Sequence, residues 1–157
     1  MARRRKSYLK KAYESTGASD DTSANIYHSM LESIAWQDLS TKQKELYWCM
    51  KDRKYQEKQH PNGDESMFCF NKYLWAEEYR LYADTDGRGF QRDLRALINH
   101  GFIRCIESGM TTRTKSIYQY SEKWRLFGTE GFEISADEMN AGLARRLRKE
   151  KKSNDVE

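Results

Sequence analysis

The side chains best suited to a chemical task lie between Asp84 and Gly101, where polar residues recur at helical spacing. They are Arg88, Gln91, Arg92, Arg95 and Asn99. Arg can make two parallel hydrogen bonds to the edge of a guanine, and Gln can do the same with adenine. A helix that exposes these residues is therefore suited to contact the base edges of nucleic acid.

The same segment has apolar residues on what would be the opposite side of a helix. They fall at i, i+4, i+7 and i+8, the spacing of one helical stripe: Phe90, Leu94, Leu97 and Ile98. Asp84 or Thr85 can cap the N-terminus, and Gly101 stands where a left-handed residue would end the helix. The pattern predicts a helix of about four turns.

A predicted β-hairpin follows this helix directly. Residues 102–106 and 116–120 are rich in β-branched and aromatic side chains, and a polar stretch with Gly109 joins them. A basic-faced helix followed by a hairpin with a basic tip is the order of a recognition helix and its wing. We therefore expect an α+β fold, a winged helix-turn-helix with a three-helix core, that binds double-stranded DNA. The expected contact residues are Thr85, Arg88, Gln91, Arg92, Arg95, Thr112, Arg113 and Lys115.

Local signals place two elements in the first third of the chain. We expect a short strand over residues 25–28 and one or two helical turns over 29–39. Ser40 and Gln43 form a capping-box pattern, which opens a longer helix over 41–57.

The next elements lead up to the predicted recognition helix. Residues 58–65 contain the only proline and an Asn-Gly-Asp turn signal, so they predict a loop. A brief strand is expected over 67–70. Asn71 is expected to cap a helix over 72–79, which would be the first helix of the helix-turn-helix, with a turn at 81–83.

Both ends of the chain are basic and are expected to lie outside a folded unit of residues 25–127. Residues 1–24 can follow a phosphate backbone or enter a minor groove, or can form a solvated tail. Their basic cluster is Arg3, Arg4, Arg5 and Lys6. Residues 128–157 comprise a linker and a helix opened by the capping-box pair Ser135 and Glu138. That helix would form the interface of a homodimer or contact the DNA backbone, or would fray in solution.

The net charge of +4 does not by itself indicate a DNA-binding domain. Residues 1–24 hold six Lys or Arg and three acids, which gives +3, and residues 136–157 hold six and five, which gives +1. The middle, residues 25–135, holds sixteen of each and is neutral. A DNA-binding face must therefore arise from local segregation of charge.

The sequence also indicates a compartment. No apolar run approaches the roughly 20 residues of a membrane helix, and no apolar stretch follows the basic start as it would in a secretory signal. The three cysteines, Cys49, Cys69 and Cys105, are far apart, which argues against a disulfide framework. We expect a cytoplasmic protein that associates with the nucleoid or a plasmid.

Motifs of enzyme and metal chemistry are absent from the sequence. No Cys-x-x-Cys or His-x-x-x-His spacing of a zinc site occurs. Neither does a nucleophile elbow, a P-loop or a dinucleotide fingerprint. We therefore expect no catalytic residue, no metal and no cofactor.

Three segments carry a resemblance to known proteins. Residues 27–40 include Tyr-His-Ser-Met-Leu-Glu-Ser followed by Trp-Gln-Asp-Leu-Ser, residues 93–103 span the end of the predicted recognition helix, and 112–118 lie on the wing. Across residues 26–124 the chain resembles winged-helix proteins of bacterial mobile elements. These include the DNA-binding domains of plasmid replication initiators and accessory proteins of conjugative elements. The resemblance implies a role in replication, conjugation or transcription on a plasmid or integrative element, with a relaxase or replication protein as a partner.

Two alternatives stay open from the sequence. Asp84, Asp86 and Asp93 lie among the predicted DNA-binding cations, so they either repel phosphate or orient the arginines. The rival function is a winged-helix adaptor whose aromatic-rich surface binds another protein without DNA specificity.

Overall fold

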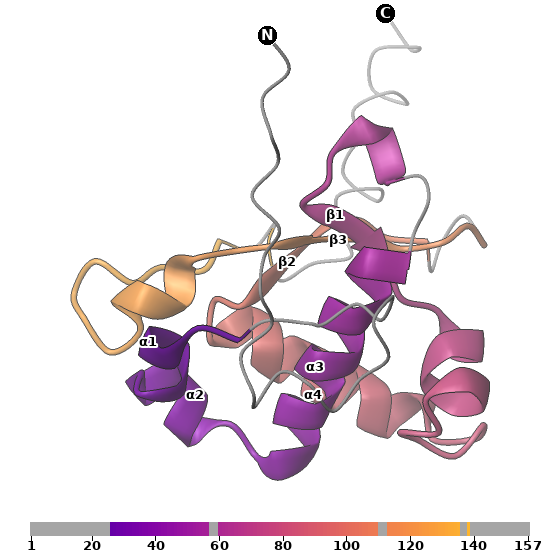
Figure 1. Cartoon of the computed structure of the whole chain (residues 1–157), viewed down its shortest axis with the longest axis horizontal. Helices are drawn as coiled ribbons and strands as arrows, with labels where there is room; N and C mark the ends of the chain where they lie inside the picture. The colour runs from indigo at the N-terminus through magenta and orange to yellow at the C-terminus, as the bar shows by residue number, and fades with distance from the viewer. Residues whose placement is uncertain (1–25, 57–59, 110–112, 136–137, 139–157) are drawn as a thin grey trace, which may run out of the picture.

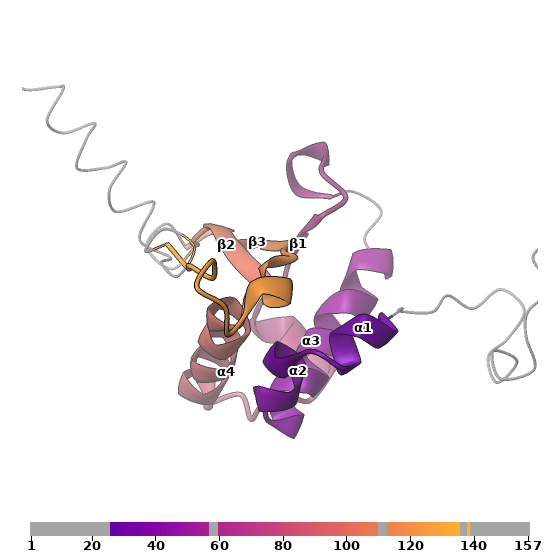
Figure 2. The same ribbon diagram turned by 90° about the vertical axis from the view of Figure 1, so that its left-hand side faces the viewer.

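The computed structural model describes residues 26–56, 60–109, 113–135 and 138. The predicted N-terminal arm, with Arg3, Arg4, Arg5 and Lys6, lies outside these residues, as do Thr112 and nearly all of the predicted C-terminal helix. The described chain is mixed α+β. Figure 1 and Figure 2 show the helices α1 to α4 on one side of a small sheet.

The first elements differ from the prediction. Ile26 and Tyr27 form no strand, and residues 29–39 are divided between two short helices, α1 (His28–Leu31) and α2 (Ile34–Asp38). Ser33 separates them, because its hydroxyl donates to the Met30 carbonyl at 2.6 Å and accepts from the Trp36 amide at 3.1 Å. One side chain therefore closes α1 and caps α2.

Helix α3 (Thr41–Gln56) begins as its capping box predicts. The Ser40 amide donates to Gln43 Oε1 at 2.9 Å, and the Gln43 amide donates to Ser40 Oγ at 3.4 Å. The helix buries Leu46, Tyr47 and Met50 and packs along α4.

The loop after α3 leads to a strand and a second helix. A turn, η2 (Pro61–Gly63), precedes strand β1 (Met67–Cys69). The predicted helix follows as a six-residue π-helix, η3 (Tyr73–Glu78). Asn71 Oδ1 accepts from the Leu74 amide at 3.2 Å, so Asn71 caps this helix as expected.

The connection between η3 and α4 is not a simple turn. Arg80 has a left-handed backbone with φ of 51°, and the chain then buries Leu81 and Tyr82 instead of exposing them. The two helices are therefore joined by a segment that belongs to the core.

Helix α4 (Gly87–Asn99) begins two residues later than a cap at Asp84 would place it and one residue later than a cap at Thr85 would. Its cap is Asp86, whose Oδ1 accepts from the Gly89 amide at 2.9 Å. A Cβ at Gly89 would lie 2.4 Å from the Asp86 carboxylate, so the capping contact needs a glycine there. The predicted N-cap was wrong because three candidate caps stand close together and only Asp86 reaches the first turn.

Gly101 ends α4 as predicted, with φ of +78°. The Gly101 amide donates to Ile98 and the Phe102 amide to Leu97, which is the Schellman pair of hydrogen bonds. Gly101 thereby turns the chain directly from α4 into strand β2 (Ile103–Glu107).

The predicted hairpin is present, and its second strand is β3 (Ile117–Tyr120). Strand β1 pairs with the other side of β3, so the described strands form one antiparallel sheet in the order β1-β3-β2. Phe68 and Cys105 both register with Tyr118, and all three are buried. This row faces the helices, which places the hairpin beside α4.

Aromatic rings connect the two ends of the described chain. A turn, η4 (Lys123–Leu126), follows β3 and buries Trp124, as predicted. Trp124 stacks on Phe102 with centroids 6.0 Å apart, and Phe102 contacts Trp36 and Tyr47 at 5.7 Å and 5.3 Å. The α1 and α2 segment is thus held against the end of α4 by ring contacts.

The chain continues to pack after Phe127. Phe132 contacts Phe127 edge to face with centroids 5.1 Å apart, and Ile134 packs against the core. Ser135 and Glu138 form the predicted capping box, with bonds of 2.9 Å and 3.2 Å. In the described part of the chain, no helix is long and apolar enough to cross a membrane.

Gly101 provides a test of how α4 and the hairpin are joined. A Cβ at Gly101 would lie 2.6 Å from the Trp124 amide nitrogen. We expect Gly101→Ala to lower the free energy of unfolding by about 2 to 5 kcal/mol, since the left-handed conformation and the clash both add to the cost. Urea unfolding followed by circular dichroism measures this.

Gly63→Ala is the matched control. Gly63 also has a positive φ, of 69°, but a Cβ there would meet nothing within 4 Å. Gly63→Ala should lower the free energy of unfolding by about 1 to 2 kcal/mol, which is the conformational cost alone. Equal losses for the two variants would show that the close approach of Trp124 to Gly101 does not matter.

Candidate nucleic-acid interface

An open groove of about 890 Å³ runs along the exposed face of α4. We call it the α4 groove, and its lining is Thr85, Gly87, Arg88, Gln91, Arg92, Arg95, Ala96 and Asn99. The groove brings together every contact residue that the sequence places on this helix. Three arginines and no acid line it, so the neutral domain does segregate charge at this face.

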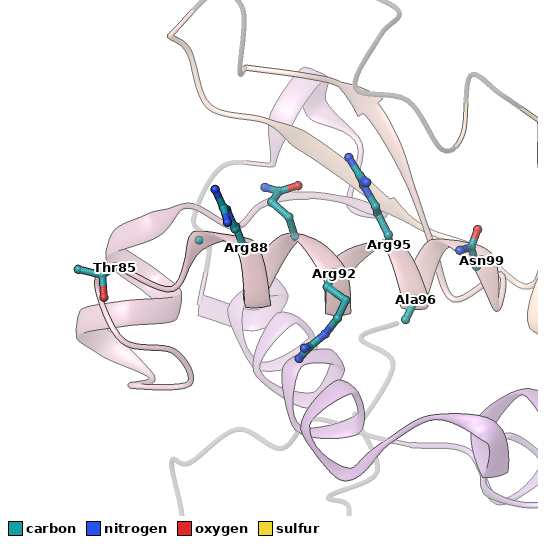
Figure 3. Close-up of a pocket in the computed structure, with 8 residues that line it drawn as sticks. Thr85, Arg88, Arg92, Arg95, Ala96 and Asn99 are labelled. Carbon is teal, nitrogen blue, oxygen red and sulfur yellow. The ribbon is translucent and has the colours of Figure 1, made fainter.

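The three arginines do not point the same way. Figure 3 shows Arg88 and Arg95 on one side of α4 and Arg92 on the opposite side, toward α3. All three are exposed. Among the described residues, neither Arg88 nor Arg95 forms an ion pair with an acid, so both guanidinium groups are available to a ligand.

Arg92 is held by its neighbour in the chain. Its Nε and Nη2 donate to the Asp93 carboxylate at 3.1 Å and 3.3 Å. The Asp93 side chain is 2% exposed, whereas that of Arg92 is 73% exposed. The hydrogen bonds and charge of Asp93 raise the pKa of Arg92. Asp93 therefore orients one arginine and does not neutralise the other two.

Asp93 is also the centre of a buried hydrogen-bond network. The Tyr82 hydroxyl donates to its Oδ2 at 2.9 Å, and Gln43 Nε2 donates to its Oδ1 at 3.2 Å. Burial alone would raise the pKa of Asp93, but the hydrogen bonds from Arg92, Tyr82 and Gln43 bring it below its ordinary value. Burial and the bond to Asp93 raise the pKa of Tyr82. Asp93 thus remains ionised and joins α3, α4 and the segment between η3 and α4.

The other two acids near the groove are also engaged. Asp84 Oδ1 lies 2.5 Å from Lys72 Nζ, and Asp86 caps α4 through Gly89. Neither pairs with Arg88 or Arg95. The acids that the sequence places among the cations therefore leave the α4 groove positive.

A second groove, of about 360 Å³, lies between α4 and the hairpin. We call it the hairpin groove. Its charged lining residues are Lys72, Arg113 and Lys115, again without an acid, and it shares Gly87 and Gln91 with the α4 groove. The helix and the hairpin therefore present adjoining cationic surfaces.

Sequence reasoning missed some lining residues. Lys72, the helical residue directly before η3, lines the hairpin groove, and Ala96 and Asn99 complete the α4 groove. Helical spacing does place Asn99 on the polar side of this helix, although Asn99 is not among the expected contact residues. Lys72 could not be recognised in this way, because only the tertiary fold brings its helix to the hairpin.

The described residues show little sign of other chemistry. No group of three His, Cys, Asp or Glu side chains among them could hold a metal ion. Burial raises the pKa of both Cys49 and Cys105 to about 11, so each stays a protonated thiol near neutral pH.

The Asp93 network generates a prediction for stability. Asp93→Ala removes the acceptor of the Tyr82 and Gln43 donors, and we expect the free energy of unfolding to fall by about 1 to 3 kcal/mol. Tyr82→Phe removes only one of these bonds and should cost about 1 kcal/mol. Urea unfolding at pH 7 measures both.

The same network should depend on pH. The folded pKa of Asp93 is lowered, so its contribution is complete above the ordinary aspartate pKa, about 3.9, and is lost as pH falls through the lower folded value. The difference in unfolding free energy between the protein and Asp93→Asn should therefore be constant from about pH 6 to 8 and shrink below about pH 4. A difference that does not shrink in acid would contradict the ionised state of Asp93.

Comparison with known proteins yields no relative: no protein-family model, no curated protein and no solved structure matches the chain. The resemblance to winged-helix proteins of bacterial mobile elements therefore stays a prediction made from the sequence.

Proposed function

We propose that this protein binds double-stranded DNA as a winged helix-turn-helix, with α4 as the recognition helix and the β2–β3 connection as the wing. The observation that carries the proposal is the α4 groove, which gathers Arg88, Arg92 and Arg95 without an acid. The adjoining hairpin groove adds Arg113 and Lys115, together with Lys72, which pairs with Asp84. Positive charge gathered on one helix and the hairpin beside it is the electrostatic footprint of a DNA-binding domain.

The dimensions of α4 suit the major groove of DNA. Its 13 residues span about 20 Å, and a major groove about 12 Å wide admits an α-helix. Arg88 and Arg95 are two turns apart on the same side of α4 (Figure 3). In this arrangement they would contact guanine edges, and Gln91 between them would contact adenine.

The hairpin would contact the sugar-phosphate backbone. Arg113 and Lys115 are exposed and line the hairpin groove with Lys72. Backbone contacts of this kind set the register of a protein on DNA without reading sequence. The proposed role is a regulatory or accessory factor of a plasmid or integrative element, in replication, conjugation or transcription.

One feature favours the adaptor function as a second candidate. Large apolar side chains are exposed on α1, α2 and α3 and at the residue before α1, outside the lining of both grooves: Tyr27, Leu31, Ile34 and Trp48. Trp48 is 50% exposed and Ile34 is 67% exposed. Such a surface suits contact with another protein, a relaxase, a replication protein or a second copy, and would leave α4 free for DNA.

Binding to a labelled duplex at several salt concentrations tests the proposal. Arg88→Ala and Arg95→Ala should each weaken binding by about 1 to 3 kcal/mol and relax base preference at one position. Arg113→Ala and Lys115→Ala should weaken binding equally on all sequences and reduce the salt slope by about 1 each. Fluorescence anisotropy, with selection from a randomised duplex library, measures both effects.

Arg125→Ala is the control, since Arg125 is an exposed arginine on η4 outside both grooves. It should bind as the parent protein does. If no duplex binds more tightly than about 100 μM, which is the non-specific range, the adaptor function replaces DNA recognition.

A further inference from the structure

We propose that Lys42 and Arg92 form a second phosphate-binding site, on the α3 side of α4, for the DNA strand opposite the one at the hairpin. The inference rests on the proposed DNA-binding function and assigns Arg92 a role different from the base contact that its sequence position suggests. Arg88 and Arg95 are left as the arginines that contact bases.

Arg92 has the geometry of an oriented phosphate ligand. A guanidinium group has five N–H donors, and Asp93 accepts from two of its nitrogens at 3.1 Å and 3.3 Å. With 73% of its side chain exposed, the remaining donors face outward. The buried carboxylate fixes the direction of the group before any ligand arrives, which lowers the entropy cost of binding.

Lys42 is connected to Asp93 through Tyr82. Its Nζ lies 4.5 Å from the centre of the Tyr82 ring, and the hydroxyl of that ring donates to Asp93. Lys42 is exposed and, within the described part of the chain, forms no ion pair. One buried Tyr82–Asp93 unit therefore supports two cations that come from two helices.

The cluster presents two cations at the surface. Lys42 and Arg92 contribute +2 and Asp93 contributes −1, while Asp86 at the start of α4 is a further negative charge that, like Asp93, raises the pKa of Arg92. The Asp93 carboxylate is buried and Asp86 is engaged in capping α4 through Gly89, whereas both positive groups are at the surface. A phosphate approaching from solvent would meet the cations first.

The position of the cluster matches the shape of DNA. A helix in the major groove has a phosphate backbone on each side. The hairpin supplies cations on one side of α4, and Figure 3 shows Arg92 on the side opposite to Arg88 and Arg95. Lys42 and Arg92 would thus contact the second backbone and hold α4 between the two strands.

The test uses the full chain and a labelled mixed-sequence duplex of about 30 base pairs, bound at several salt concentrations. Lys42→Ala and Arg92→Ala should each reduce the slope of log K against log salt by about 1. Both should weaken binding equally on all sequences and leave base preference in the randomised library unchanged. Lys42→Ala removes only a surface contact to a ring, so it stays informative if Arg92→Ala is poorly folded.

Lys44→Ala is the matched control. Lys44 stands two residues further along α3, about 200° around the helix, with its Nζ 6.0 Å from the Trp36 ring. Lys44→Ala should not alter the slope of log K against log salt. Three results would overturn the site while DNA binding stands. The first is an unchanged salt slope for both Lys42→Ala and a folded Arg92→Ala, and the second is a change in slope for Lys44→Ala as large as that for Lys42→Ala. The third is an altered base preference for Arg92→Ala. Failure of the parent protein to bind duplex would instead reject the proposed function itself.

Discussion

The arrangement of the helices depends on one buried carboxylate, Asp93. Burying an ionised group is costly unless hydrogen bonds replace its water, and here Tyr82, Gln43 and Arg92 supply them. The three donors come from different segments, so they are satisfied together only when α3, α4 and the segment between η3 and α4 adopt this arrangement. The bonds that stabilise the domain therefore also set the direction of the exposed arginine.

The placement of the hairpin depends on a second constraint, at Gly101. Its left-handed backbone ends α4 and starts β2 within two residues, and Phe102 then enters the aromatic cluster with Trp36, Tyr47 and Trp124. Because the strand leaves the helix at a fixed angle, β3 and the cations that precede it are held beside the start of α4. The two grooves adjoin for this reason.

Local signals in the sequence were enough for part of this architecture. The apolar stripe of α4, the Ser40 capping box and the glycine after the helix each depend on residues a few positions apart, and the structure has them as predicted. The prediction was wrong where several local signals of the same kind stand within a few residues of one another. Asp84, Thr85 and Asp86 are all good caps, but only Asp86 makes the capping bond. The helix expected over 29–39 is two helices, because Ser33 makes two local hydrogen bonds between them.

The candidate site shows where sequence patterns cease to be informative. Helical spacing puts Arg92 on the same face as Arg88 and Arg95, but its direction is decided by Asp93, which Gln43 contacts from fifty residues earlier in the chain. The distribution of charge over the surface is likewise decided by the fold and not by the sequence pattern. Residues 25–135 are neutral in sum, yet in the fold Asp84 pairs with Lys72, Asp86 caps the start of α4 and Asp93 is buried. A neutral domain can therefore present a cationic helix, because the three acids nearest this helix are used in structural contacts while its arginines remain at the surface.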